Sequence, residues 1–285
     1  MKYDLQLNVT LNCNYNCSFC YLKRKNENMN FLDVQRIINH YNKQINSLTI
    51  SGGEPLIHPE IIGIVDFLEQ FDFPINLTSN FSEFRKIYNR QIGLRINYWI
   101  GIDRISTDLE QMITQAAYRG YRIFASVPLY DNYLGVLHSL IKMAYFFSGI
   151  LLLIPTPSYG KKYVPLNPEE WFKRLENTFN IIKPHFAKIY YEPGFREKVI
   201  SKSKRRCQSG NAIVINPDLL SYPCCLVVQK LKGEKNIQPV SMNDSDCYYL
   251  SIYDEYLKDS PYEALCPIFV KTLGEKPEGY LTHLH

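Results

Sequence analysis

Three cysteines crowd a short stretch near the amino terminus, NVTLNCNYNCSFCYL, which contains Cys13, Cys17 and Cys20. This spacing can bring three thiolates onto one face of a loop, and thiolates are good ligands for zinc and for iron–sulfur clusters. Three protein ligands leave one position of such a centre open. The stretch therefore predicts a metal centre with a position kept for a substrate or cosubstrate. A zinc site that borrows a ligand such as His58 and three unrelated buried thiols are the alternatives.

A second motif, TISGGEPLIHPE, places Gly52, Gly53 and Glu54 directly after an apolar run. A glycine pair alone indicates only a tight turn. Glycines without a Cβ also let the backbone approach a ligand, and a carboxylate such as that of Glu54 can accept a hydrogen bond from an ammonium group. We therefore expect this motif to belong to a ligand site that it shares with the cysteines.

Strand and helix patterns alternate from the cysteine motif to about residue 194. Helical spacing of apolar residues predicts helices at 31–44, 59–71, 82–91, 106–121, 133–147 and 168–186. Shorter apolar runs predict strands at 45–53, 75–80, 96–103, 122–130, 149–157 and 188–193. This alternation predicts right-handed βαβ units, and we expect an α/β fold with a partial (β/α)6 TIM-type barrel over residues 1–195. Ligands of such sheets bind beyond the carboxyl ends of the strands, where both motifs fall.

The composition places few limits on function. The chain has 285 residues, of which 46% are hydrophobic, and a net charge of +4 that indicates neither a nucleic-acid nor a membrane partner. No apolar signal segment opens the chain, and the longest apolar run, 144–155, is shorter than the roughly 20 residues of a membrane span. We therefore expect a cytoplasmic protein whose eight cysteines serve as metal ligands or redox groups rather than as disulfides.

The two motifs together resemble the radical S-adenosylmethionine (radical SAM) superfamily, and aromatic Phe19 just before the last cysteine fits the same pattern. The resemblance covers residues 5 to about 160. It implies an enzyme in which Cys13, Cys17 and Cys20 bind a 4Fe–4S cluster and the open iron binds S-adenosylmethionine (SAM). Reductive cleavage of SAM then yields a 5′-deoxyadenosyl radical that abstracts a hydrogen atom from a substrate.

Later strand ends match the family in part. The segment TSNF resembles a Ser-Thr-Asn-Gly segment, with Phe81 at the glycine, and WIGIDR resembles Val-Ser-Leu-Asp-Gly, with Gly101 at the serine, Asp103 matching and Arg104 at the last glycine. Strand-end position alone adds Ser126. The residues expected to contact SAM are Phe19, Gly52, Gly53, Glu54, Ser79, Asn80 and Ser126. For Ser79 and Asn80, a polar strand end that caps the next helix is an equal alternative.

A second set of cysteines begins with CQSGNAIVINPDLLSYPCC, which resembles the auxiliary-cluster regions called SPASM or Twitch. The resemblance implies a small cluster-binding domain over 196–285 with one auxiliary 4Fe–4S cluster. Its expected ligands are Cys207, Cys224, Cys247 and Cys266. Since neighbouring side chains of a strand point to opposite faces, Cys225 is expected to be the spare thiol and a possible hydrogen donor to the substrate. Leu219 stands at a family glycine, so we expect a different turn there. Free, partly buried thiols are the alternative.

The resemblance also implies the substrate class. We expect a ribosomally made peptide or a protein side chain, changed by oxidation, cross-linking or epimerisation, which makes the enzyme an oxidoreductase or an isomerase. We expect an external electron donor such as flavodoxin or ferredoxin. Because only 12 residues precede Cys13, a separate leader-binding protein is also expected.

Three other interpretations remain open. One is a radical SAM dehydrogenase or epimerase of a small natural-product intermediate, and another is a non-catalytic zinc or iron–sulfur binding module. The third is a radical SAM enzyme that modifies RNA. Its only support is the basic run containing Lys202, Lys204, Arg205 and Arg206, which weighs little beside a net charge of +4.

Overall fold

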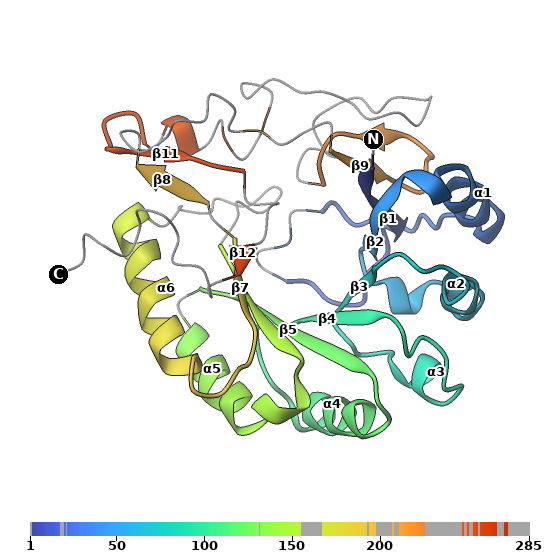
Figure 1. Ribbon diagram of the computed structural model, residues 1–285, viewed down its shortest axis with the longest axis horizontal. Coiled ribbons are helices and arrows are strands. Elements are labelled where there is room, and N and C mark those ends of the chain that lie inside the picture. The colour runs from blue at the N-terminus through green and yellow to red at the C-terminus, as the bar shows by residue number, and fades with distance from the viewer. Residues whose placement is uncertain are drawn as a thin grey trace.

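Strand and helix alternate from Tyr3 to Tyr191 in the computed structural model of the chain (Figure 1). The structure describes residues 2–17, 20, 22–130, 132–154, 167–192, 194–197, 207, 211–225, 247, 250, 253–255, 257–266 and 271–272. The alternating strands are β1 (Tyr3–Thr10), β2 (Ile45–Gly52), β3 (Ile75–Ser79), β4 (Asn97–Gly101), β5 (Arg122–Pro128), β6 (Gly149–Leu153) and β7 (Ile189–Tyr191). Each of them pairs in parallel with the next. This is the α/β architecture with a parallel sheet that the sequence predicts.

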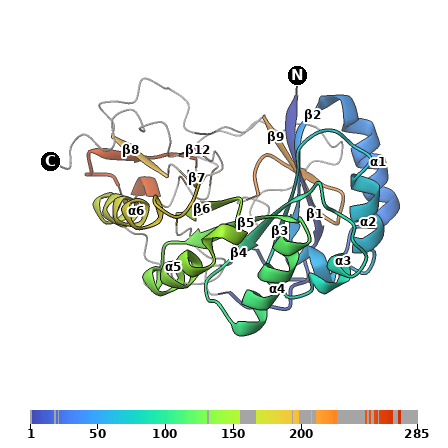
Figure 2. The same cartoon turned by 60° about the horizontal axis from the view of Figure 1, so that its bottom comes forward.

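Six helices connect these strands and cover the outer face of the curved sheet (Figures 1 and 2). They are α1 (Phe31–Tyr41), α2 (Ile61–Leu68), α3 (Arg85–Tyr88), α4 (Thr107–Tyr118), α5 (Tyr133–Lys142) and α6 (Pro168–Ile182). Single turns of 3₁₀-helix are η1 (Asn42–Gln44), η2 (Pro55–Ile57) and η3 (Ala144–Phe146). Polar side chains start several helices, since Ser106 accepts a hydrogen bond from the amide of Leu109 and Asn167 accepts one from Glu170. No helix of the described part is long and apolar enough to cross a membrane.

The core lies between the outer face of the sheet and the helices. Along β4, for example, Tyr98 and Ile100 are fully buried, whereas Asn97 and Trp99 between them are only partly buried. Strands β3, β6 and β7 alternate in the same way. Because side chains of a strand point alternately to its two faces, one face of the sheet is sealed by helices and the other faces the interior of the barrel.

Strands from beyond residue 195 extend this sheet at both edges. Strand β9 (Ala212–Ile215) pairs in parallel with β1, β10 (Ser221–Tyr222) is antiparallel to β9, and β12 (Lys271–Thr272) is antiparallel to β7. The order is therefore β10-β9-β1-β2-β3-β4-β5-β6-β7-β12. Strands β8 (Phe195–Glu197) and β11 (Tyr262–Ala264) form a separate antiparallel pair near α6 (Figure 1). The domain boundary at 195 and 196 stays a prediction, and segments from both sides of it share one sheet.

Two residues that stand where the family pattern has glycine adopt the left-handed backbone conformation that glycine favours. Phe81, after β3, has φ 66°, and Leu219, in the turn between β9 and β10, has φ 61°. The expectation that Leu219 changes the turn type was therefore wrong. The amide of Leu219 donates to the Asn216 carbonyl (2.9 Å), and the amide of Leu220 donates to the Asp218 carboxylate (3.0 Å). These bonds hold a conformation that costs a leucine about 1 kcal/mol or more.

Candidate functional site

The cysteine loop starts where β1 ends, and its base is closed by main-chain hydrogen bonds. The amide of Leu11 donates to the Glu27 carbonyl (2.9 Å), and the amide of Lys25 donates to the Leu11 carbonyl (3.0 Å). Thr10 and Asn28 form a further bridge, in which the Thr10 hydroxyl donates to the Asn28 side chain (2.7 Å). The three cysteines therefore belong to a loop whose two ends are held together beside the end of β1.

The glycine pair attaches this loop to the next strand. The Gly53 amide donates to the Thr10 carbonyl and the Glu54 amide donates to the Asn12 carbonyl, both over 2.8 Å. A Cβ on Gly52 would lie 2.0 Å from the Thr10 carbonyl oxygen, and one on Gly53 would lie 2.0 Å from that of Asn12. The glycines were expected to allow backbone to approach a ligand. In the structure, they allow the close approach of the cysteine loop itself.

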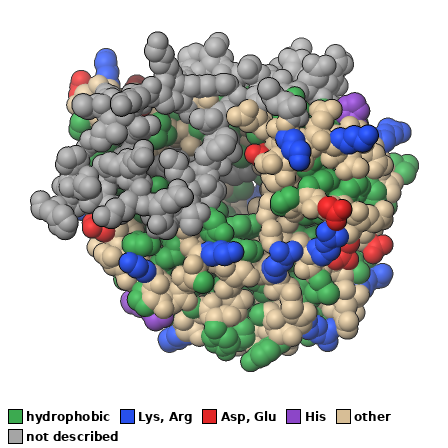
Figure 3. All heavy atoms as spheres, in the orientation of Figure 1, with side chains coloured by type: hydrophobic (Ala, Val, Ile, Leu, Met, Phe, Trp, Pro, Cys, Tyr) green, Lys and Arg blue, Asp and Glu red, His purple; other side chains and the backbone are tan. Residues whose placement is uncertain are grey.

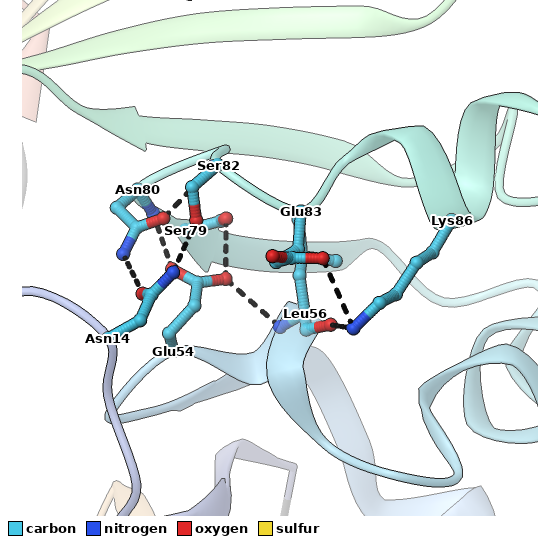
Figure 4. Close-up of polar contacts among 8 residues, drawn as sticks. All are labelled: Asn14, Glu54, Leu56, Ser79, Asn80, Ser82, Glu83 and Lys86. Carbon is cyan, nitrogen blue, oxygen red and sulfur yellow. Dashed lines mark hydrogen bonds and ion pairs between the residues drawn. The ribbon is translucent and has the colours of Figure 1, made fainter.

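Glu54 ties the end of β2 to the end of β3 (Figure 4). Its buried carboxylate accepts hydrogen bonds from the Leu56 amide (2.9 Å), the Ser79 hydroxyl (2.7 Å) and the Asn80 amide (2.6 Å). Burial raises the pKa of Glu54 to about 7, although these three hydrogen bonds favour the ionised form. The carboxylate therefore holds two strand ends in fixed relation.

Ser79 and Asn80 are engaged within the protein. The Ser79 hydroxyl, besides donating to Glu54, accepts from the Phe81 amide (2.7 Å). The Asn80 side chain donates to the Asn14 side chain (2.9 Å), and Asn14 donates in turn to the Ser82 hydroxyl (2.8 Å) (Figure 4). Asn14, between the first two cysteines, thus links the cysteine loop to the end of β3. Sequence reasoning missed it, and its only signal was an amide inside the cysteine motif.

The three thiols share one electrostatic environment. Burial raises the pKa of Cys13, and it raises that of Cys17 to about 11, with further contributions from Asp103 and from the neighbouring thiols. Arg104 opposes the shift at Cys17. The guanidinium of Arg104 also lies over the ring of Tyr15, 5.7 Å from its centre. Asp103 and Arg104, at the end of β4, therefore face the cysteine loop.

The remaining predicted residues lie in different places. Ser126, in β5, pairs with Gly101 and is buried on the inner face of the sheet. Phe19 and the basic run 202–206 lie outside the described residues. His58 is occupied, because its Nε2 bonds to the Met29 carbonyl (2.8 Å) and its Nδ1 accepts from the Glu60 amide (3.0 Å). These bonds argue against His58 as a fourth metal ligand.

The second set of cysteines is buried. Cys207, Cys224, Cys247 and Cys266 all have little exposed surface, whereas Cys225 is partly exposed. Cys225 and Cys20 pack against the same small cluster of Leu22, Val214 and Tyr222. The placement of β9 and β10 beside β1 therefore brings Cys225 to the cysteine loop.

A carboxyl group stands at the end of β7 and also interacts with Cys225. Glu192 accepts a hydrogen bond from the Ile154 amide (2.9 Å). Burial raises its pKa to about 8, the Ile154 amide opposes this shift, and Cys225 adds to it. The side chain of Glu192 is consequently protonated at neutral pH.

An open, parallel α/β barrel with a three-thiol loop at the carboxyl ends of its strands is the class of protein that this geometry defines. The family model "Radical SAM superfamily" matches residues 7–155, so the chain belongs to the radical SAM superfamily and is an enzyme. Membership implies a 4Fe–4S cluster and SAM.

Similar proteins agree with this assignment. The chain is 30% identical over 123 residues to a probable GTP 3′,8-cyclase of Methanothermobacter marburgensis, which is 40% of each protein. It is 32% identical over 127 residues to a GTP 3′,8-cyclase of Staphylococcus aureus, covering 39% of the chain and 36% of that protein. The matched part thus spans less than half of these relatives. Streptococcus suis SuiB bound to precursor peptide SuiA shares the fold, with a TM-score of 0.64 at 15% identity, over 82% of this chain and 62% of SuiB.

The thiols of the loop fit an iron–sulfur cluster in their chemistry. Among the described residues, no three His, Cys, Asp or Glu side chains are arranged to hold a single metal ion. A four-iron cluster does not require that arrangement, because each thiolate binds a different iron atom. The loop also meets a second condition, because its base is fixed by main-chain bonds and leaves the thiols available as ligands.

Proposed function

We propose that this enzyme binds a 4Fe–4S cluster through Cys13, Cys17 and Cys20 and abstracts a hydrogen atom from a peptide or protein side chain. The cluster with SAM would supply the 5′-deoxyadenosyl radical. The observation that carries the proposal is the attachment of the cysteine loop to Gly53 and Glu54 by two hydrogen bonds of 2.8 Å at the carboxyl end of the sheet. That attachment places the thiols beside the strand ends at which ligands of parallel sheets bind.

The residues around the loop would divide the work. Gly52 and Gly53 hold the loop against β2, and Glu54 holds the end of β3 in register with it. Main-chain groups and the free edges of Ser79 and Asn80 would then face SAM, with Ser126 on the neighbouring inner face. The bonds of Glu54 to three protein donors favour a positioning role for its carboxylate over direct capture of the SAM ammonium group.

A peptide substrate is supported by the fold shared with SuiB, whose structure was solved with a precursor peptide. The relatives named GTP 3′,8-cyclase favour a nucleotide as the second candidate. Their similarity covers only the first part of the barrel, so it bears on SAM binding more than on the substrate. A small natural-product intermediate is a third candidate. The net reaction, whether oxidation, cross-linking or epimerisation, follows from the substrate radical.

The second set of cysteines is proposed to hold one auxiliary 4Fe–4S cluster. Four buried thiols in the carboxyl-terminal part, Cys207, Cys224, Cys247 and Cys266, support it. Cys225 would be the spare thiol, and its place beside Cys20 supports a role as hydrogen donor to the substrate radical. An external donor such as flavodoxin or ferredoxin would supply the electron for SAM cleavage, and a separate protein would deliver a leader peptide.

The test is anaerobic reconstitution with iron and sulfide, followed by an iron count and an assay for 5′-deoxyadenosine. We expect about eight irons per chain, and about four when Cys13, Cys17 and Cys20 are all replaced by alanine. The matched control is Cys225→Ala, which should keep about eight. A wild-type count of about four refutes the auxiliary cluster. Bound zinc without iron, or the absence of 5′-deoxyadenosine, refutes the proposed chemistry.

Proposals for RNA as the substrate find little support on the visible surface. Lys and Arg side chains on the face shown in Figure 3 are scattered among other residues and do not gather in one patch. Sequence-independent binding to RNA needs several clustered cations along the backbone path. Unchanged activity after neutralisation of Lys202, Lys204, Arg205 and Arg206 would exclude this alternative.

A further inference from the structure

The inner face of the barrel is accessible although its outer face is sealed. Outward-facing Leu77, Tyr98 and Leu152 are fully buried under the helices. Their inward-facing neighbours are partly exposed, and these are Asn76, Thr78, Asn97, Trp99, Leu151, Leu153 and Tyr190. Figure 3 shows a hollow near the centre of the molecule, and Figure 1 shows the strands curving around that centre. The inward side chains therefore line a space that a substrate can reach.

Polar groups line one side of this interior. The Thr78 hydroxyl donates to that of Ser51 (2.8 Å), which joins β3 to β2. The Asn76 side-chain oxygen accepts from the side chains of Asn97 (3.2 Å) and Trp99 (3.0 Å). These residues are neutral amides and hydroxyls, so they can offer hydrogen bonds but no charge.

Aromatic rings line the other side. The ring of Trp99, on β4, stacks on that of Phe124, on β5, with centres 4.4 Å apart and planes 21° apart. Tyr190, on β7, meets both rings edge-on, at 5.7 Å from Trp99 and 6.5 Å from Phe124. Partly exposed rings held in such an arrangement offer a flat apolar surface for another ring or an aliphatic chain.

Fixed charge is confined to the two ends of the interior. At the amino-terminal end, Asp4 accepts from the Ser47 hydroxyl (2.6 Å) and Arg122 donates to the Arg95 carbonyl (2.6 Å). The inward side chains of β1 to β7 between these ends include no Lys, Arg, Asp or Glu among the described residues. At the carboxyl end, Glu192 is protonated at neutral pH because burial raises its pKa to about 8.

We propose that the barrel interior binds an uncharged aromatic or aliphatic side chain of a peptide, stacked against Trp99 and Phe124, and excludes nucleoside triphosphates. The inference rests on the proposed function and names the substrate group that this site takes. A triphosphate would bring several negative charges into an interior that offers no cation, and burying unpaired charge is strongly unfavourable. An apolar side chain would instead gain from burial against the rings.

Titration calorimetry on the reconstituted full-length enzyme tests the proposal. The probes are GTP and two blocked tripeptides, N-acetyl-Ala-Phe-Ala-amide and N-acetyl-Ala-Lys-Ala-amide. We expect saturable binding of the phenylalanyl peptide, and binding of the lysyl peptide and of GTP that is weaker by at least about tenfold. Tighter or equal binding of GTP overturns the inference, as does the absence of phenylalanyl binding up to about 5 mM.

Two variants locate the site. Phe124→Ala removes one ring of the stack and should weaken the phenylalanyl peptide by about tenfold. The matched control is Tyr118→Ala, which removes a ring that is 77% exposed on the outer surface and should change nothing. In Trp171→Phe, which removes the fully buried second tryptophan, the peptide should still change the remaining Trp99 fluorescence. An unchanged affinity in Phe124→Ala, or silent Trp99 fluorescence, overturns the assigned location.

These readouts do not depend on SAM cleavage. Failure of the proposed radical chemistry would show in the iron count and in the 5′-deoxyadenosine assay. Failure of the substrate inference would show only in the order of probe affinities and in the two ring variants.

Discussion

The contact between the glycine pair and the cysteine loop makes Gly53→Ala the most informative substitution. The added Cβ would lie 2.0 Å from the Asn12 carbonyl oxygen and 2.6 Å from its carbonyl carbon, and side-chain carbons do not approach such atoms closer than 3.0 Å. The loop must therefore retreat by about 1 Å. Neither contacting atom belongs to a flexible side chain, so the main chain itself has to move.

That retreat also breaks the attachment of the loop. A shift of about 1 Å takes the 2.8 Å bond between the Glu54 amide and the Asn12 carbonyl beyond hydrogen-bonding distance. The neighbouring bond from Gly53 to Thr10 weakens with it. Overpacking costs about 1–3 kcal/mol, and two lost bonds cost about 0.5–1.5 kcal/mol each. We expect the free energy of unfolding to fall by about 3 kcal/mol.

Urea denaturation and the iron count after reconstitution measure the two effects. In Gly53→Ala we expect the lower stability and fewer than about four irons at the first site. The control is Gly135→Ala, because a Cβ at Gly135 in α5 meets nothing within 4 Å. That change should raise stability by about 0.5–1 kcal/mol and leave the iron count unchanged. Wild-type stability and iron content in Gly53→Ala would refute the idea that close backbone approach holds the cysteine loop.

Three further substitutions test the surrounding groups. Glu54→Gln should lower the free energy of unfolding by about 1–3 kcal/mol, because an amide cannot accept from both strand ends and turns a donor toward the Asn80 amide; unchanged urea denaturation would contradict this. Asn14→Ala should cost under about 1 kcal/mol but speed the loss of iron to a chelator, and equal rates would argue against its linking role. Glu192, with a pKa raised from 4.5 to about 8, keeps a proton that the unfolded chain releases, so stability should fall by about 1.4 kcal/mol per pH unit across that window. Glu192→Gln should flatten this slope in pH-dependent denaturation while exposed Glu169→Gln keeps it, and equal slopes would show that the carboxyl does not titrate as inferred.

Local pattern was sufficient to predict the strands and helices of the barrel. The helix predicted at 106–121 is α4 (Thr107–Tyr118), and the strand predicted at 75–80 is β3 (Ile75–Ser79). Both have apolar residues at the period of their own element, and a polar residue stops or caps them. The helix predicted at 82–91 was too long, because only Arg85–Tyr88 is helical and turns flank it.

Features that depend on distant parts of the chain escaped prediction. The pairing of β9 with β1 joins residues more than two hundred positions apart, such as Asn8 and Asn216, whose side chains are hydrogen-bonded over 2.8 Å. Phe81 adopts a positive φ because its ring stacks on Phe84, with centres 4.0 Å apart, and is fully buried. Burial of that ring offsets the backbone strain, and a sequence pattern alone does not report such compensation.

The cysteine loop is fixed by groups other than its thiols, and this separates two properties of the site. Main-chain bonds of Leu11 and Gly53 hold the base of the loop, and the Asn14 side chain holds its outer part. The bonds that the structure gives to Cys13 and Cys20 are local, to residues two positions away. Replacing the cysteines should therefore remove iron with little loss of stability, whereas replacing Gly53 should remove both. That difference allows an iron count to be read as ligand loss in one case and as a displaced loop in the other.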